Sequence, residues 1–155
     1  MAGWVAHVAR VHTTHGHWWM AWGDDGLVSA ARRRADAVAR ARASGAGAVQ
    51  AADPASAPAH PDWSRMPGGF RGRALRACHA IPPGACVTYG ELARRAGSPG
   101  AARAAGSAMA SNPLPVVIPC HRVVRMDGAP GGYSAGGPAV KTRMLMAEGA
   151  LPPAR

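Results

Sequence analysis

Large aliphatic side chains are scarce in this chain, and that scarcity limits what it can fold into. Leu, Ile, Val and Phe together supply 21 of the 155 residues, whereas Ala alone supplies 36. With a formal net charge of +10, so small a share of strong hydrophobes is typical of disordered chains. Any folded core must therefore be built largely from alanine, and the pattern along the chain has to show where it forms.

Several classes of protein are excluded at once. No apolar run approaches the roughly 20 residues of a membrane-spanning helix. The first residues, MAGWVAHVAR, lack the basic and apolar segments of a secretory signal. Three cysteines, Cys78, Cys86 and Cys120, are too few for a disulfide framework and fit a reducing compartment. We therefore expect a cytoplasmic protein without membrane attachment.

The charge is concentrated in the second half of the chain. Residues 1–62 carry six basic and five acidic side chains, whereas residues 63–155 carry twelve basic and three acidic ones. A GC-rich genome would explain why 17 of the 18 basic residues are Arg, but not why one half lacks acids. A surface of one sign favours a polyanionic partner, and nucleic acid is the common case. We therefore divide the chain into an N-terminal domain with a linker, 1–62, and a nucleic-acid-binding domain, 63–155.

The first 30 residues predict a small sheet. Apolar segments at 17–22 and 27–30 flank Asp24-Asp25-Gly26, a pattern typical of a β-hairpin, and residues 5–11 add a third strand. Three tryptophans, Trp18, Trp19 and Trp22, suit the core of this hairpin better than a base-stacking platform.

The next segment gives weaker signals. Residues 31–44 are rich in Ala and Arg and predict a helix ended by Gly45, with little apolar surface for docking. Ala, Gly, Pro and Ser dominate residues 45–67, which predicts a linker. The compositional warning of disorder therefore stands for residues 31–66, and whether they are ordered without DNA is left open.

The second half predicts a helix-turn-helix. Helical segments are expected at 70–80, 89–96 and 101–110, with a Gly-containing turn at 97–100 between the last two. Any pair of antiparallel helices gives a similar pattern. The segment 101–110, however, has one charged residue, Arg103, among small side chains. Small residues allow close approach either to a neighbouring helix or to a nucleic-acid groove, where Arg103 would occupy the space left by an extruded base.

A candidate nucleophile follows. The apolar run Val116 to Ile118 predicts a buried segment that brings Cys120 and His121 to its end after Pro119. A thiol reacts as thiolate, and a nearby imidazole is a usual means of removing its proton. In an extended chain the two side chains point to opposite sides, so a water relay or a turn at Pro119 is required.

Together these segments resemble the O6-alkylguanine-DNA alkyltransferase family over about residues 68–149. The motifs that carry the resemblance are Ile81-Pro82-Pro83-Gly84, Val87-Thr88-Tyr89-Gly90-Glu91, Arg103-Ala104-Ala105-Gly106, Asn112-Pro113, Pro119-Cys120-His121-Arg122-Val123, Gly132-Tyr133-Ser134 and Lys141 to Glu148-Gly149. Residues 133–137 are one residue longer than the family pattern, which puts the shape of the pocket lid in question. The implied fold is α/β (α+β): a small N-terminal sheet with a helix, then a mostly helical domain with a helix-turn-helix and the cysteine loop.

The resemblance also implies roles in catalysis. Cys120 would accept the alkyl group, His121 would take the thiol proton through a water, and Glu148 would orient the imidazole. Asn112 would brace the turn, and Tyr89 would donate a proton to the departing guanine.

Further residues are implied in binding. The carbonyl of Cys120 and Val123, with Tyr133 and Ser134, would form the base pocket, and Arg103 would replace the flipped base. The expected DNA contacts are Ala102, Ala104, Gly106, Ser107 and Arg122.

The function implied is repair of O6-methylguanine in double-stranded DNA by irreversible, single-turnover methyl transfer to Cys120, without a cofactor. Activity on O4-methylthymine is left open. A monomer is expected, with several copies along the DNA near the nucleoid. The alternative is a damage sensor that flips the lesion without reacting; a Cys-His hydrolase lacks an evident oxyanion loop. His12, His15 and His17 suggest zinc, but the first 77 residues contain no Cys, and no metal is predicted.

Overall fold

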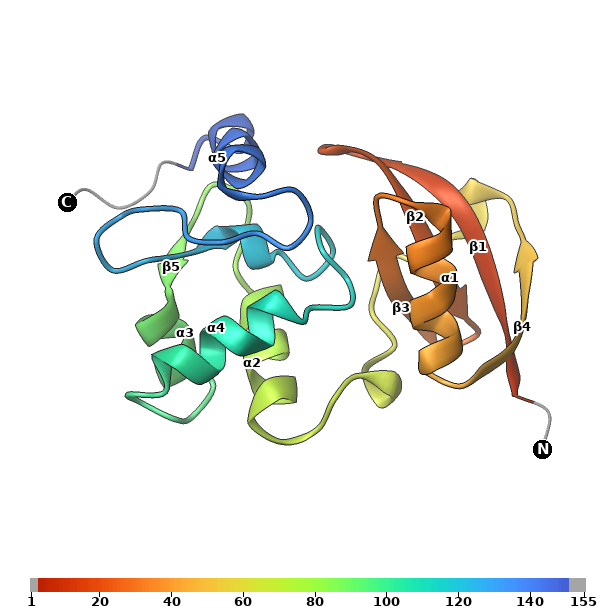
Figure 1. Cartoon of the computed structure of the whole chain (residues 1–155), viewed down its shortest axis with the longest axis horizontal. Helices are drawn as coiled ribbons and strands as arrows, with labels where there is room; N and C mark the ends of the chain where they lie inside the picture. Colours follow the sequence, from red (N-terminus) through yellow and green to blue (C-terminus); the bar gives the residue numbers. More distant parts are fainter. Residues whose placement is uncertain (1–2, 151–155) are drawn as a thin grey trace. The chain divides into compact units, whose positions relative to one another are not determined.

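The computed structural model describes residues 3–150 (Figure 1). The chain divides into two compact units, one formed by the residues up to Met66 with Pro113–Val117, the other by Pro67–Asn112 and the residues from Ile118 onward. The short return of the chain to the first unit is held in part by the Ala30 amide, which donates to the Pro113 carbonyl at 2.9 Å. No helix among residues 3–150 is long and apolar enough to cross a membrane.

The first unit is built on a four-stranded sheet in the order β3-β2-β1-β4. Strands β1 (Trp4–Thr13), β2 (Gly16–Gly23) and β3 (Gly26–Ala31) are successive antiparallel neighbours. The predicted hairpin and its third strand are therefore confirmed. Gly26 enters β3 with φ +136°, and a Cβ there would lie 2.8 Å from the His60 carbonyl oxygen, so this turn requires glycine.

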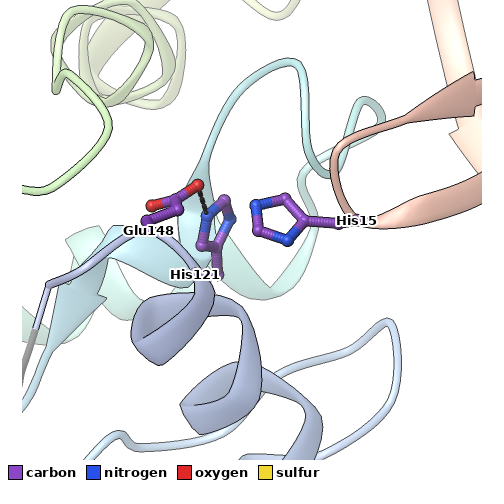
Figure 2. Close-up of side chains that lie close together, drawn as sticks. All are labelled: His15, His121 and Glu148. Carbon is purple, nitrogen blue, oxygen red and sulfur yellow. Dashed lines mark hydrogen bonds and ion pairs between the residues drawn. The ribbon is translucent and has the colours of Figure 1, made fainter.

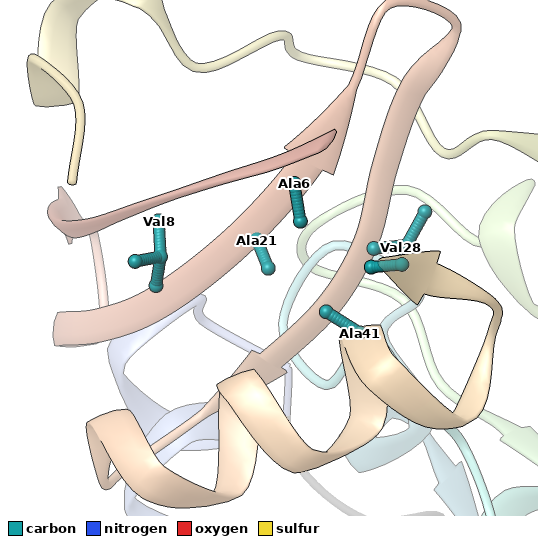
Figure 3. Close-up of a cluster of buried hydrophobic side chains, with 6 residues drawn as sticks. Ala6, Val8, Ala21, Val28 and Ala41 are labelled. Atoms are coloured by element: carbon teal, nitrogen blue, oxygen red, sulfur yellow. The ribbon is translucent and has the colours of Figure 1, made fainter. Parts of the chain in front are cut away.

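Helix α1 (Arg34–Ala43) packs on this sheet (Figure 1), and β4 (Ala46–Ala51) then runs parallel to β1. The buried side chains of α1 are Ala37 and Ala41. Figure 3 shows the small side chains that form this core, among them Ala6, Val8, Ala21, Val28 and Ala41. Because alanine lets a helix approach a sheet closely, the unit forms a core without many large aliphatic residues.

The linker predicted between residues 45 and 67 is wrong. That interval contains β4 and two short 3-10 turns, Pro54–Ser56 and Trp63–Arg65. Leu27 also exchanges backbone hydrogen bonds with His60 and Asp62, at 2.9 and 2.8 Å. The strand sequence AGAVQA has low β propensity and is held by its long-range pairing with β1, which local composition does not report. Residues 31–66, whose order the sequence left open, thus contain a helix, a strand and two short turns.

The tryptophans belong to the core of the first unit. Trp18 is fully buried and Trp22 is 5% exposed, while Trp19 packs against the alanine-rich cluster. The guanidinium of Arg32 lies 4.0 Å from the centre of the Trp18 ring. The interpretation of these rings as core is confirmed.

The second unit is mostly helical. Its elements are α2 (Gly69–His79), β5 (Val87–Thr88), α3 (Tyr89–Arg95), α4 (Ala102–Ala110), a 3-10 turn (Cys120–Arg122), β6 (Val123–Val124) and α5 (Pro138–Ala147). Strands β5 and β6 pair in parallel. Helices α2, α3 and α4 match the three predicted segments to within one residue at each end, whereas the apolar pattern did not predict α5.

Helices α3 and α4 have clear ends. The Thr88 hydroxyl caps α3 by accepting a hydrogen bond from the Glu91 amide at 3.1 Å. Gly97, at φ +86°, ends the helix: its amide donates to the Arg94 carbonyl and that of Ser98 to the Ala93 carbonyl. The two helices around this turn are consistent with the predicted helix-turn-helix.

The segment before Cys120 differs from its prediction in two respects. Ile118 is fully buried, but Val116 and Val117 are half-buried, and Val116 has φ +75°. Among residues 3–150 it is the one non-glycine residue with positive φ, a strained conformation between Pro115 and Pro119. Cys120 and His121 then lie in a 3-10 turn and not in an extended strand.

Candidate active site

Cys120 lines a cavity in the second unit. The residue is 4% exposed and begins the 3-10 turn after Pro119. The Asn112 side-chain amide donates to the Ile118 carbonyl at 2.8 Å, and the Cys120 amide donates to the same carbonyl at 2.8 Å. Asn112 is thus hydrogen-bonded to the segment that leads into the cysteine turn.

The cavity has a volume of about 360 Å³ and combines aromatic, small and polar side chains. Its lining residues are Tyr89, Gly106, Met109, Ala110, Cys120, Gly132, Tyr133 and Ser134. The structure therefore brings Tyr89, Tyr133 and Ser134 together around Cys120. Met109 and Ala110 line the cavity too, although no sequence motif pointed to them, as does Gly132, which the Gly132-Tyr133-Ser134 motif included without a role.

Burial raises the pKa of the Cys120 thiol above its ordinary value. The hydrogen bond from the Asn112 side chain and the positive charge of Lys141 oppose this rise, as does the Cys120 backbone amide. The thiol is therefore protonated at neutral pH, and a reaction at sulfur requires a group that removes its proton.

His121 and Glu148 form a hydrogen-bonded pair beside this turn (Figure 2). The His121 Nε2 lies 2.8 Å from Glu148 Oε1, and the imidazole is fully buried. An ionised carboxylate only accepts hydrogen bonds, so Nε2 carries the proton and Nδ1 carries the lone pair that can accept another. Glu148 follows α5 directly, where it occupies the helix C-cap. The pair is an imidazole base oriented by a carboxylate.

Arg122 is not placed to contact DNA as expected. Its Nη2 and Nε donate to the two Glu148 carboxylate oxygens at 2.7 and 2.9 Å, and its Nη1 donates to the Ile81 carbonyl at 2.7 Å. The side chain is only 12% exposed. All three guanidinium nitrogens are thus engaged inside the unit, where Arg122 holds the carboxylate that orients His121.

Val123 also lies away from the cavity. It is fully buried in β6, opposite Val87 of β5, and is not among the lining residues. A buried β-branched residue in a two-residue strand serves the core of the unit. The cavity is lined by Tyr133 and Ser134 and not by the Val123 side chain, while the expected role of the Val123 carbonyl stays a prediction.

Sequence reasoning assigned no role to Lys141, which the structure brings to the site. It lies on α5 and is fully buried, and its Nζ donates to Tyr89 Oη at 3.2 Å and to the Gly132 carbonyl at 3.3 Å. One indication was present in the sequence, because Lys141 begins the last of the motifs that resemble the family. Nothing in the residues around it distinguishes it from an ordinary solvent-exposed lysine.

Helix α4 presents an exposed face of small side chains. Ala102, Arg103, Ala104 and Ser107 are exposed and Gly106 is half-buried, whereas Ala105, Ala108 and Met109 face the core. A second, more open cavity of about 600 Å³ includes Ala102, Arg103 and Arg125 in its lining. Tyr89 and Gly106 line both cavities, so the exposed face of α4 adjoins the cavity of Cys120.

The family model described as "6-O-methylguanine DNA methyltransferase, DNA binding domain" matches residues 69–150, more than half of the chain. The chain belongs to this family. The match covers most of the second unit, including the cysteine turn, the lining of the cavity and helices α3 and α4. The resemblance stated from the sequence motifs is confirmed.

Named relatives agree with this membership. The methylated-DNA–protein-cysteine methyltransferase of Mus musculus is 62% identical over 66 residues, which are 43% of this chain and 31% of the relative. The chain spans about a third to a half of the curated relatives it matches.

Among solved structures, the O6-methylguanine-DNA methyltransferase of Pyrococcus kodakaraensis has a TM-score of 0.66 at 25% identity, covering 94% of this chain and 99% of that one. The structure of Mycobacterium tuberculosis OGT in complex with DNA has a TM-score of 0.63 at 25% identity, covering 94% and 92%. The expected fold class is thereby confirmed.

Proposed function

We propose that this protein repairs alkylated DNA by transferring the alkyl group from O6 of guanine to the sulfur of Cys120. One observation carries the proposal: Cys120 lines a cavity of about 360 Å³, and the residue that follows it in the same 3-10 turn, His121, is held by the Glu148 carboxylate. Relatives named as methylated-DNA–protein-cysteine methyltransferases and a neighbour in complex with DNA support it.

The chemistry is an in-line displacement. His121 accepts the thiol proton through a water, and Glu148 stabilises the imidazolium that forms. The sulfur then attacks the alkyl carbon, the carbon–oxygen bond breaks, and its electron pair stays on guanine O6. Tyr89 supplies a proton to the base as this charge develops and recovers one afterwards. The net result is a thioether, and the thiol proton ends on guanine.

Access to a base in a duplex requires its extrusion into the cavity. The exposed small residues of α4 allow the helix to approach a groove closely, and Arg103 fills the space that the base leaves. The net positive charge of the second half of the chain holds the phosphates. A lesion that pairs poorly costs less to extrude than a normal base, which favours damaged sites.

The stability of the thioether product determines how many alkyl groups each protein molecule can remove. A thioether is not cleaved by water or by cellular thiols, so each molecule reacts once. The alkyl donor is the DNA itself, and the reaction as written uses no cofactor. The protein acts as a monomer, with several copies along one duplex.

Intact-protein mass spectrometry after mixing with duplex DNA that contains O6-methylguanine tests the proposal. We expect a gain of one CH₂ unit, located on the Cys120 peptide, and no gain in Cys120→Ala. Cys78→Ala is the matched control, because it removes another buried thiol of the same unit. Tight binding with unchanged mass would contradict methyl transfer and favour the damage sensor. A duplex with O4-methylthymine in the same assay defines the substrate range.

A further inference from the structure

Two histidines face each other at the turn end of the β1–β2 hairpin, in the first unit. The register of the two strands pairs His12 with His17, next to the turn at residues 14 and 15. Residues directly opposite each other in neighbouring strands have side chains on the same face of the sheet. The two imidazole rings accordingly lie close together, with their centres 4.8 Å apart and their planes at 54°. Both residues are exposed, and the proposed alkyl transfer uses neither of them.

The backbone beneath the pair is held by groups other than the two rings. The Thr13 hydroxyl donates to the Gly16 carbonyl at 2.8 Å and accepts from the His15 amide at 3.1 Å. Gly16 has φ +87°, a conformation that favours glycine, and β1 and β2 continue their antiparallel pairing away from the turn. The Cα positions of both histidines are therefore fixed, which lowers the entropy cost of binding one ligand to both side chains.

The chemistry of two adjacent imidazoles favours a metal ion as their shared ligand. Neutral imidazole binds late first-row divalent ions, among them Ni²⁺, Cu²⁺ and Zn²⁺. Two imidazole nitrogens on one ion, each at about 2.0–2.1 Å from it, lie about 3 Å apart. Ring centres 4.8 Å apart are compatible with this separation, because exposed side chains are free to rotate about χ1 and χ2. Two protonated rings would repel across the strands, whereas one ion bound to both neutral rings joins them.

The surroundings of the pair limit the number of protein ligands and the affinity. Among residues 3–150, no Cys, Asp, Glu or further His joins His12 and His17 in a set of three ligands. Flanking arginines add positive charge: Arg10 lies two residues before His12 on the same face of β1, and Arg32 Nη1 lies 3.9 Å from the position of a Cβ on Gly16. Water must therefore complete the coordination, and binding is weaker than at a closed site with four protein ligands.

We propose that His12 and His17 form a two-histidine site for a divalent late transition-metal ion on the surface of the first unit, with water in the remaining positions. The bound ion joins β1 to β2 beside the turn and stabilises the folded hairpin by mass action. This site takes a different ligand set from the zinc site considered from the sequence, since it needs neither a cysteine nor a carboxylate. It is also separate from the alkyl-transfer reaction, because neither histidine lines the cavity of Cys120.

The test is calorimetric titration of the full chain with Ni²⁺, which binds imidazole and, unlike Cu²⁺, does not oxidise thiols. We expect His12→Asn and His17→Asn each to weaken binding by at least about 10²-fold, because either change converts a chelating pair into a single imidazole ligand. The double variant should bind no more weakly than either single variant. His79→Asn, which removes an exposed histidine from α2, is the matched control and should leave the affinity unchanged. Mg²⁺, which prefers oxygen ligands, should not bind.

Titration with Zn²⁺, followed by NMR of the histidine ring signals, locates the site. The largest shifts should occur at His12 and His17, and they should persist in Cys120→Ala. Equal Ni²⁺ affinities of the wild-type protein and the two single variants would overturn the inference, as would Zn²⁺ shifts centred on His121. If an Asn variant does not fold, the ring signals of the wild-type protein decide. These measurements use no DNA, so their outcome is independent of the proposed methyl transfer.

Discussion

Replacing Glu148 by Gln isolates the role of a single negative charge at the site. Its carboxylate accepts three hydrogen bonds, from His121 Nε2 and Arg122 Nη2 at Oε1 and from Arg122 Nε at Oε2. Both oxygens are engaged, so the amide nitrogen of Gln must face at least one N–H donor. The less unfavourable orientation keeps the oxygen at Oε1 and places the amide nitrogen against Arg122 Nε.

The substitution is expected to change both the free energy of unfolding and the rate of methyl transfer. Glu148 and Arg122 are 7% and 12% exposed, and removing one partner of a buried ion pair costs about 3–5 kcal/mol in unfolding free energy. The retained hydrogen bond keeps the His121 ring in place, but the imidazolium loses its counter-charge. We expect methyl transfer to slow by about 10²- to 10⁴-fold, the usual contribution of a positioned acid or base.

Glu91→Gln is the matched control, because Glu91 also bridges two arginines, Arg94 and Arg95, but on the exposed surface of α3. Such surface pairs contribute little to stability. Urea unfolding and quenched mass time courses of both variants provide the comparison. An unchanged transfer rate in Glu148→Gln would refute the assignment of His121 as base, and equal destabilisation of the two variants would refute the reasoning from burial.

Three further outcomes are expected. Asn112→Ala removes the brace on the Ile118 carbonyl and should slow methyl transfer by about tenfold or more, measured by the same mass assay. Arg103→Ala should slow repair of duplex DNA by roughly tenfold but leave reaction with free O6-methylguanine base unchanged, because only extrusion needs the exposed guanidinium. Burial raises the thiol pKa values of Cys78 and Cys120. The unfolded chain therefore releases these protons first, and the free energy of unfolding should fall as pH rises above about 8.5 in urea titrations, less steeply in Cys78→Ala.

Local sequence patterns predicted the turns and helix ends, because these depend on the backbone conformation of a few neighbouring residues. The turn at Asp24-Asp25-Gly26 and the Gly97 helix end follow from backbone requirements that neighbouring residues reveal. Strand β4 does not, because its stability comes from pairing with β1, some 40 residues earlier in the chain. Propensity therefore suggested a linker where long-range pairing forms a strand.

The site was predictable in its chemistry and less so in its geometry. Motif spacing pointed to Cys120, His121 and Glu148, and the structure places the latter two in contact. Arg122 was expected to contact DNA on the basis of the family resemblance. The Arg122 side chain is buried because it forms hydrogen bonds with Glu148, 26 residues later. No local sequence pattern predicts that contact.

The arrangement of buried charge offers a reason for the weakly hydrophobic composition of the second unit. His121, Glu148, Arg122 and Lys141 are all buried or nearly so, and each lowers stability relative to a well-packed hydrophobe of similar size. They are joined by hydrogen bonds in the second unit: His121 and Arg122 both bond to the Glu148 carboxylate, and Lys141 donates to Tyr89, which lines the cavity of Cys120. The first unit, by contrast, buries mainly alanine and tryptophan. Burying charged side chains near a single thiol lowers stability, and such a loss is expected where a protein holds polar groups in place for a reaction.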